Sequence, residues 1–287
     1  MWELEKIIQT PTPLQRLQAD WLEDRQVEIW VKRDDLTHPN IMGNKWRKWQ
    51  GHLRHMQERN IHQFCTFGGA HSNHIWASAA LGQIMGFRMK AFIRGDELNP
   101  YSSPTLRFAT QAGMELVFLS RADYRHKKVE PDALGESWHV VPEGGSGPLA
   151  WEGFQGLVNE VESIFQPDAY VGAMGTGGSL IGLAKYTSVK VIGVPALKGI
   201  DWNPVLQNAG AYVDIWDGFH EGGYAKKSKE LMDWMQGFQQ SHGFALDSIY
   251  TAKAFRALEW QVKNNFFPPH SRVVFIHSGG LTGDYTG

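Results

Sequence analysis

Lys45 is the residue of this chain that raises the question of covalent chemistry. It follows Gly43-Asn44 in the stretch IMGNKWRKWQGHL, residues 41–53. A lysine amine serves as a nucleophile or base only when its pKa is lowered, and burial beside Lys48 or Arg47, or a place at a helix N-terminus, would lower it. Taken by itself, Lys45 reads more simply as a solvated surface charge. Its chemistry therefore depends on what the rest of the chain brings to it.

A glycine-rich stretch, GAMGTGGSLIGL at residues 172–183, has the pattern of a strand, a loop and the start of a helix. Glycines allow backbone N–H groups to close on an anion, and the helix dipole favours negative charge there, so a phosphate is the natural ligand. The stretch departs from the G-x-G-x-x-G pattern because Leu180 replaces the last glycine, and no Walker Gly-Lys-Ser/Thr follows. A nicotinamide-binding module is thus disfavoured, while a phosphate loop and a tight structural turn both remain open.

Three polar residues, Ser72, Asn73 and His74, stand at a predicted helix start in FGGAHSNHIWASA, residues 67–79. Their side chains could hydrogen-bond a ligand lying over the end of the preceding strand. The simpler reading is a helix cap followed by a surface histidine. His71 and His74 are three residues apart, but no set of carboxylates or cysteines accompanies them, so the sequence predicts no metal site.

Two tyrosines are further candidates for a site. Tyr250 and Thr251 lie just before a predicted helix in DSIYTAKAF, residues 247–255, and Tyr224 follows a Gly-Gly pair. Packing and a Gly-Tyr turn are the simpler readings of these positions. The chain has no Gly-x-Ser-x-Gly elbow, and its lone cysteine, Cys65, falls in a predicted buried strand, so neither serine nor cysteine nucleophilic chemistry is indicated.

Together, a lysine, a phosphate loop and a polar helix start suggest a Schiff base to pyridoxal phosphate. In such a site the glycine loop fixes the phosphate and the lysine forms the imine. An asparagine side chain donates to the ring oxygen, and a hydroxyl or carboxylate faces the pyridine nitrogen.

The predicted elements that must position these residues alternate between strands and helices, which indicates an α/β protein with parallel sheets. The predicted strands are residues 27–33, 62–70, 88–95, 114–120, 168–178, 189–197, 211–217 and 271–280. The predicted helices are residues 72–87, 105–113, 148–165, 227–243 and 252–266. The charged stretch 120–131 is predicted to be irregular, solvated surface.

Four predicted strands or turns run into glycines, at 68–69, 144–145, 175–178 and 279–280. In open parallel sheets, ligands bind beyond the carboxyl ends of the strands. The four junctions together therefore suggest a crevice, although each alone could be only a turn.

Composition narrows the class of protein. The 287 residues include 42% hydrophobic residues and carry a formal net charge of −2, which gives no general attraction to nucleic acid or anionic membranes. One cysteine excludes an internal disulfide and fits a reducing compartment. The N-terminus lacks a signal-peptide pattern, and no apolar run approaches 18 residues. We expect a soluble cytoplasmic protein.

Seven motifs occur in the order expected for one family: TPLQRL, VKRDDLTHP followed by GNKWRK, FGGAHSNH, VPEGGS, GTGGSLIGL, YTAKA and FIHSGG. They resemble the pyridoxal-phosphate enzymes that include 1-aminocyclopropane-1-carboxylate (ACC) deaminase and D-cysteine desulfhydrase, over about residues 10–283. The resemblance implies the tryptophan synthase β-like fold, fold type II. It further implies a large cofactor-binding domain of residues 1–45 plus 156–287, a small domain of residues 46–155, and a homodimer.

The resemblance also implies roles for individual residues. Lys45 would be the Schiff-base lysine, Asn73 would bond the ring oxygen, and Thr251 would meet the pyridine nitrogen. The phosphate would be held by Lys48, Gly175, Thr176, Gly177, Gly178 and Ser179. The substrate would be met by Ser72, Asn73, His74, Tyr224 and Tyr250, with Ser72 and the two tyrosines taking part in catalysis beside Lys45.

Two positions separate the branches of the family. ACC deaminases carry glutamate where this chain has Thr251, and leucine where it has Ser278. A hydroxyl leaves the pyridine nitrogen closer to neutral than a carboxylate does, which suits β-elimination of a thiolate better than opening of a cyclopropane ring.

We therefore expect α,β-elimination on a small amino acid, with D-cysteine as the leading substrate, giving pyruvate, ammonia and hydrogen sulfide. Alternatives are ACC deaminase, an eliminase or racemase acting on D-serine or a chloro-amino acid, and a non-catalytic pyridoxal-phosphate carrier.

Overall fold

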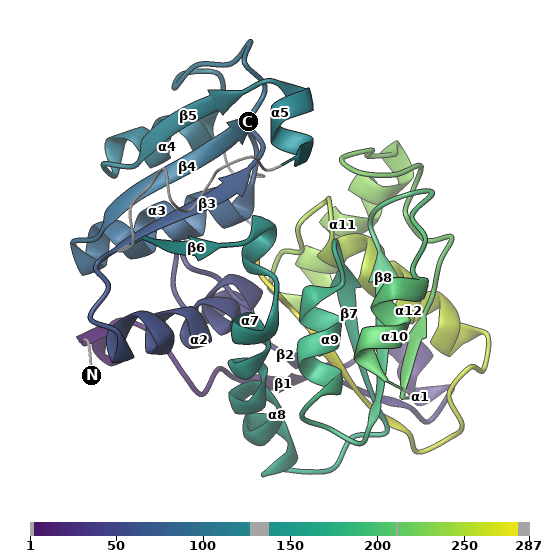
Figure 1. Ribbon diagram of the computed structural model, residues 1–287. Coiled ribbons are helices and arrows are strands. Elements are labelled where there is room, and N and C mark those ends of the chain that lie inside the picture. The colour runs from purple at the N-terminus through teal and green to yellow at the C-terminus, as the bar shows by residue number, and fades with distance from the viewer. Residues whose placement is uncertain (1–2, 127–137, 211, 281–287) are drawn as a thin grey trace.

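Two separate sheets organise the chain (Figure 1). The computed structural model describes residues 3–126, 138–210 and 212–280. The larger sheet has six strands in the order β1 (Leu14–Arg16), β2 (Glu28–Lys32), β10 (Arg272–Ile276), β7 (Ala169–Met174), β8 (Lys190–Pro195) and β9 (Val213–Ile215). Only β1 runs antiparallel to its neighbour. The smaller sheet is parallel, in the order β5 (Glu115–Leu119), β4 (Arg88–Arg94), β3 (Gln63–Gly68) and β6 (His139–Val141).

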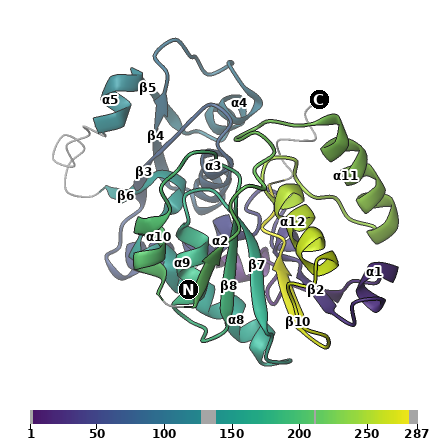
Figure 2. The same ribbon diagram turned by 90° about the vertical axis from the view of Figure 1, so that its right-hand side faces the viewer.

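The larger sheet is covered on both faces, as expected for buried parallel strands. Successive residues of β10 alternate between two apolar clusters. Val273 and Phe275 pack with α11 (Lys229–His242) and α12 (Thr251–Lys263). Val274 and Ile276 pack with α8 (Phe154–Glu162) and α9 (Gly178–Ala184). Figure 2 shows α11 and α12 on one side of this sheet, and α9 and α10 (Asn203–Ala209) on the other.

The smaller sheet packs one face against helices α2 (Asn44–Glu58), α3 (Asn73–Met85) and α4 (Pro104–Gln111). The other face is thinner, with Cys65, Phe67 and Phe92 packed against Tyr124 of α5 (Arg121–His126). The short elements α1 (Asp20–Glu23), α7 (Pro148–Glu152) and three 3-10 turns (Glu3–Lys6, Asp34–Leu36 and Glu143–Gly145) complete the described chain.

The fold class predicted from the sequence is confirmed, and each predicted strand is present. The predicted helix 148–165 is instead two helices, α7 and α8, that meet at Gly153. The chain is tight there, because a Cβ on Gly153 would lie 1.8 Å from the carbonyl oxygen of Arg47. Residues 121–126 of the charged stretch form α5 rather than irregular surface, and residues 127–131 lie outside the described part of the chain.

The domain boundaries remain a prediction. The one between residues 45 and 46 falls in the first turn of α2, and the one between residues 155 and 156 falls in the first turn of α8. Among the described helices, none has the length and apolar character needed to cross a bilayer.

Replacing Gly51 by alanine is expected to destabilise the protein by about 1–3 kcal/mol, the usual cost of forcing atoms into a packed interface. A Cβ at Gly51 would lie 1.9 Å from the carbonyl oxygen of Leu149, where α2 crosses α7. The matched control is Gly237→Ala in the middle of α11, where nothing lies within 4 Å of the added Cβ. That change is expected to stabilise by about 0.5–1 kcal/mol. Urea unfolding of both variants measures the difference, and equal midpoints would contradict the close crossing.

Candidate active site

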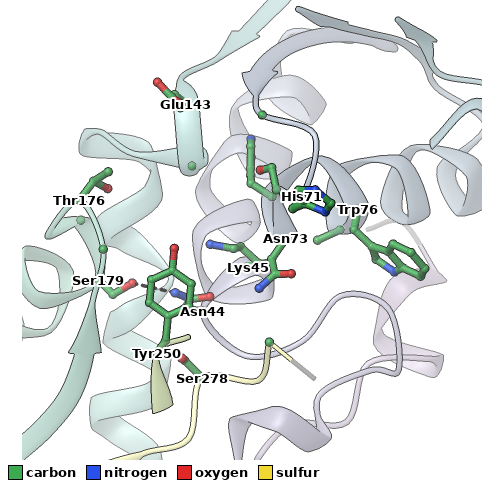
Figure 3. Close-up of a pocket in the computed structure, with 18 of the residues that line it drawn as sticks. Asn44, Lys45, His71, Asn73, Trp76, Glu143, Thr176, Ser179, Tyr250 and Ser278 are labelled. Atoms are coloured by element: carbon green, nitrogen blue, oxygen red, sulfur yellow. Dashed lines mark hydrogen bonds between the residues drawn. The ribbon is translucent and has the colours of Figure 1, made fainter. Parts of the chain in front are cut away.

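A cavity of about 550 Å³ lies where the carboxyl ends of strands from both sheets face each other. All four predicted strand-to-glycine junctions contribute to its wall, through Gly69, Gly144, residues 175–178 and residues 279–280. The start of α2 also lines the cavity, through Asn44, Lys45 and Lys48. Figure 3 shows Lys45, Asn73 and Tyr250 converging on one space, with Thr176 and Ser179 on one side and His71 and Trp76 on the other.

Lys45 lies in the first turn of α2, in the cavity wall. The residue before that helix, Gly43, has φ +50°, and a Cβ there would lie 2.2 Å from the carbonyl oxygen of Ser278. Only glycine therefore allows α2 to begin so close to the end of β10. Burial lowers the pKa of the Lys45 amine to about 8, partly opposed by the negative charge of Asp247. Arg47 does not face Lys45, because its guanidinium is bound by Asp34 and Glu160.

In the cofactor-free protein, Lys45 is expected to react with aldehydes near neutral pH. Its pKa falls from the ordinary 10.5 to about 8, and this difference enlarges the neutral fraction at pH 7 by about 300-fold. The neutral amine is the nucleophile, so the rate of pyridoxal phosphate capture should rise with pH to a midpoint near 8 and then level off. Rapid-mixing absorbance measurements from pH 6 to pH 10 would check this, and a rate still climbing at the alkaline end would contradict it.

Lys48, one turn further along α2, is buried and faces the glycine loop. Its Nζ donates to the carbonyl oxygen of Gly144 at 2.8 Å and lies 3.4 Å from where a Cβ on Gly178 would stand. Burial lowers its pKa well below the usual range, and the charge of Lys45 adds to the effect. A buried amine that faces a glycine-rich loop suits an anion, which would restore the charged form of the lysine. The arrangement therefore favours the phosphate loop over a purely structural turn.

Two further positions of that loop require glycine because neighbouring side chains lie close to the backbone. Gly177 has φ +85°, and a Cβ there would lie 2.7 Å from a methyl group of Val205. A Cβ on Gly175 would lie 3.4 Å from the ring of Tyr250. Thr176 and Ser179 line the same wall, and Ser179 Oγ accepts a hydrogen bond from Asn44 at 3.2 Å. The whole predicted loop, residues 175–179, thus borders the cavity.

The polar residues at the start of α3 serve both as a helix cap and as part of the cavity wall. Ser72 caps α3 by accepting a hydrogen bond from the backbone of Ile75 at 3.3 Å, and Ser72 and Asn73 also line the cavity. His74 is buried rather than on the surface. Its Nε2 lies 2.7 Å from the hydroxyl of Thr66, and that hydroxyl donates to a backbone carbonyl. The proton of His74 therefore fits on Nε2, which leaves its buried Nδ1 as an acceptor with no hydrogen-bond partner among the described residues.

The two tyrosines meet across the cavity from the polar helix start. The rings of Tyr224 and Tyr250 pack edge to face with centroids 6.1 Å apart, and both line the cavity. Burial raises the pKa of Tyr250, with smaller contributions from Tyr224 and Asp247. Tyr250 is therefore a neutral hydrogen-bond donor over the physiological range.

Thr251 stands apart from the other predicted site residues. It is fully buried and is not among the residues that line the cavity. Its hydroxyl donates to Asp247 at 2.6 Å and accepts from the backbone N–H of Asp247 at 2.8 Å. Asp247 also accepts from the backbone N–H groups of Tyr250 and Thr251. In this arrangement the threonine closes the turn that presents Tyr250, while Ser278 lines the cavity from the end of β10.

Several cavity residues were not singled out from the sequence. They are Asn44, Arg94, Arg121, Glu97 and Glu143. Asn44 precedes the lysine directly, and Glu143 belongs to the VPEGGS motif, so position alone could have suggested these two. The residues that the structure describes include no cluster of three or more histidine, cysteine, aspartate or glutamate side chains suited to a metal ion.

The cavity combines a partly buried lysine with a lowered pKa, a glycine loop that faces a second buried lysine, and a polar helix start. Together with the two largely parallel sheets, these features define a fold type II pyridoxal-phosphate enzyme. The chain belongs to the pyridoxal-phosphate dependent enzyme family, whose model matches residues 6–279. The residues described above fit this cofactor: a reactive amine for its aldehyde, a buried lysine and a glycine-rich loop for its phosphate, and Asn73 beside them.

Named relatives span nearly the whole chain. A Thermotoga maritima protein, which its name assigns only provisionally as an ACC deaminase, is 31% identical over 304 residues, covering 95% of each chain. A protein named D-cysteine desulfhydrase from Salmonella typhi is 26% identical, covering 96% of this chain and 93% of its own. The crystal structure of an ACC deaminase homologue superposes with a TM-score of 0.82 at 24% identity, covering 96% of this chain and 91% of the other.

Proposed function

We propose that this protein catalyses α,β-elimination on a small amino acid, with D-cysteine as the leading substrate. The observation that carries the proposal is the position of Lys45, whose pKa is lowered to about 8, in one cavity with Ser72, Asn73 and Tyr250. Pyridoxal phosphate, when bound, supplies the electron sink that makes the α-proton of an amino acid acidic. The products from D-cysteine would be pyruvate, ammonia and hydrogen sulfide.

The chain's own residues divide this task. We assign Lys48 and residues 175–179 to holding the phosphate, and Lys45 to holding the cofactor and then taking the α-proton as general base. Ser72 and Asn73 are assigned to the substrate carboxylate and the cofactor ring oxygen. Tyr250, supported by Tyr224, is assigned to contact with the substrate.

For the pyridine nitrogen we now favour Ser278 over Thr251. The hydroxyl of Thr251 is engaged with Asp247, whereas Ser278 borders the cavity at the end of β10. Either hydroxyl leaves the nitrogen without a carboxylate partner, so the preference for elimination of a thiolate over cyclopropane ring opening is unchanged.

ACC deaminase is the second candidate. It is favoured by the name of the Thermotoga maritima relative and by the likeness to the solved ACC deaminase homologue. The chemistry at Thr251 and Ser278 stands against it, since neither position offers the glutamate or leucine of that branch. A protein of Arabidopsis thaliana that is 26% identical is named as bifunctional for both reactions, so the two activities are not exclusive.

A product assay separates the candidates. The protein reconstituted with pyridoxal phosphate is incubated with D-cysteine, L-cysteine or ACC, and sulfide, ammonia and the 2-oxo acid are measured. Sulfide and pyruvate from D-cysteine, with little product from ACC, are expected. Ammonia from ACC with no sulfide from either cysteine would replace the leading substrate with the alternative. No product from any small amino acid, despite bound cofactor, would favour the carrier reading.

We also propose that the protein works as a homodimer in the cytoplasm. The family resemblance supports the dimer, and a single buried cysteine suits a reducing compartment. The predicted division into residues 46–155 and the remainder is retained as part of this proposal, because each sheet falls within one of the two parts.

A further inference from the structure

One cation in the cavity wall has no role in the chemistry described above. Arg94 is the last residue of β4 and is exposed to solvent at the carboxyl end of the smaller sheet. Among the residues that the structure describes, no carboxylate forms an ion pair with it. The other arginine of the wall, Arg121, is paired with Glu97 at 2.6 Å near the surface. A guanidinium that lines a ligand cavity and has no carboxylate partner in the described part of the chain is available to bind an anion.

The guanidinium of Arg94 is held in position by an aromatic ring. It lies over the ring of Tyr124 in α5, with its Cζ 6.0 Å from the ring centroid, and that ring is buried. Tyr124 is a neutral phenol, because burial and the charge of Glu143 raise its pKa. Glu143 also lines the cavity. The aromatic face thus supports the cation without neutralising it.

The position of Arg94 relative to the substrate follows from Gly69. Nη2 of Arg94 lies 3.8 Å from where a Cβ on Gly69 would stand. Gly69 opens the turn that ends at Ser72, whose N–H donates to the Gly69 carbonyl at 3.1 Å. Arg94 is therefore one short turn away from the residues assigned to the substrate carboxylate. The cavity of about 550 Å³ is of a size that holds drug-sized ligands, roughly 300–1,000 Å³, so it has room beyond the cofactor for a substituted amino acid.

We propose that, besides D-cysteine, this enzyme accepts S-substituted cysteines whose β-substituent ends in an anionic group, and that Arg94 binds that group. The inference rests on the proposed elimination. In that step, the α-C–H and β-C–S bonds break, Lys45 takes the proton, and the C–H electron pair forms the double bond between the α- and β-carbons. The substituent leaves as a thiolate with the C–S electron pair and is then protonated. Water hydrolyses the unsaturated product to pyruvate and ammonia.

Two probe substrates of nearly the same shape test the idea. S-carboxymethylcysteine carries a terminal carboxylate, and S-carbamoylmethylcysteine carries the neutral amide in its place. Both are used as racemates at the α-carbon, so the result does not depend on handedness, and pyruvate formation gives kcat/KM for each. The wild-type enzyme is expected to prefer the carboxylate by about tenfold, a modest factor because the arginine is solvated.

The variant Arg94→Gln should abolish this preference, mainly by lowering kcat/KM for the carboxylate. The matched control is Arg88→Gln, which removes an exposed arginine at the other end of the same strand and should keep the preference. Equal rates for the two probes in the wild type, or a preference that survives in Arg94→Gln, would overturn the proposal. An equal loss for both probes in Arg94→Gln would also overturn it, because Arg94 would then be serving the α-carboxylate common to both.

β-Chloroalanine separates this failure from failure of the proposed function, because its elimination needs no anionic substituent. If pyruvate forms from β-chloroalanine but from neither probe, the proposed role of Arg94 is refuted and the proposed elimination activity is retained. No pyruvate from β-chloroalanine would sink the elimination and, with it, the inference that depends on it.

Discussion

Replacing Lys45 by alanine is expected to remove the visible absorbance of the lysine-bound cofactor and to lower pyruvate formation by about 10³-fold or more, because both the covalent attachment and the general base are lost. Lys45 is the cavity lysine whose pKa is lowered to about 8, which fits it for both tasks. Absorbance spectroscopy after reconstitution and a coupled pyruvate assay measure the two effects. Circular dichroism confirms that the variant is folded.

Lys48→Ala is the informative control for that result. Lys48 faces the glycine loop through Gly144 and Gly178, so its loss should weaken retention of the cofactor. At saturating pyridoxal phosphate, the visible band should nevertheless return in Lys48→Ala and remain absent in Lys45→Ala. A band that persists in Lys45→Ala would assign the attachment to another lysine.

Replacing Asp34 by alanine is expected to destabilise the protein by about 3–5 kcal/mol, the cost of leaving buried charges without a partner. Asp34 is fully buried and accepts from Nε and Nη2 of Arg47, each at 2.9 Å, and from Thr12 at 2.6 Å. Arg47 and Lys32 also bind Glu160, at 2.8 and 2.6 Å. The four charges balance, so removing one leaves a net positive charge in the interior.

This network also supports the site, because Arg47 lies two residues after Lys45 and ties the start of α2 to the 3-10 turn after β2, through Asp34, and to α8, through Glu160. Asp34→Ala should therefore weaken cofactor retention as well as stability. The matched control is Asp233→Ala, which removes the same charge from an exposed pair with Lys229 at 3.1 Å and should change stability by less than about 0.5 kcal/mol. Urea unfolding of both variants gives the comparison, and similar losses would contradict the importance of burial.

The pH dependence of this effect has a definite sign. Burial alone would raise the pKa of Asp34, but the charge and hydrogen bonds of Arg47 outweigh it and lower the pKa below the ordinary 3.8. A carboxylate with a lowered pKa in the folded state contributes stability at neutral pH that is lost as the pH falls below about 4. The gap between the wild type and Asp34→Ala should therefore narrow in acid.

The alternation of apolar runs predicted the sheets well, because parallel strands buried on both faces, such as β7 and β10, are continuous apolar segments. Helix α2 was not predicted, although it carries Lys45. Its apolar stripe, formed by Trp46, Trp49, Leu53 and Met56, is interrupted by the buried polar side chains of Arg47, Lys48 and His52, which hid the amphipathic pattern on which such predictions depend. Its partners, Asp34, Gly144 and His139, come from distant segments that no local pattern connects.

The candidate site shows the same limit at single residues. The order of the motifs predicted that Lys45, Asn73 and the glycine loop share one cavity. It did not predict that the hydroxyl of Thr251 donates to Asp247 instead of facing the cavity. Arg94 went unnoticed because a charged residue at a strand end is the commonest solvated position. Its meaning depends on Gly69 and Tyr124, which fold beside it from other elements.

The attachment of the cofactor to Lys45 is the central claim, and one labelling experiment tests it most directly. The protein is reconstituted with pyridoxal phosphate, reduced with borohydride to make the lysine–cofactor bond permanent, digested and analysed by mass spectrometry. We predict one phosphopyridoxyl group per chain, on the peptide that contains Lys45. A label on Lys48 or Lys253, or one spread over the exposed lysines, would contradict the account.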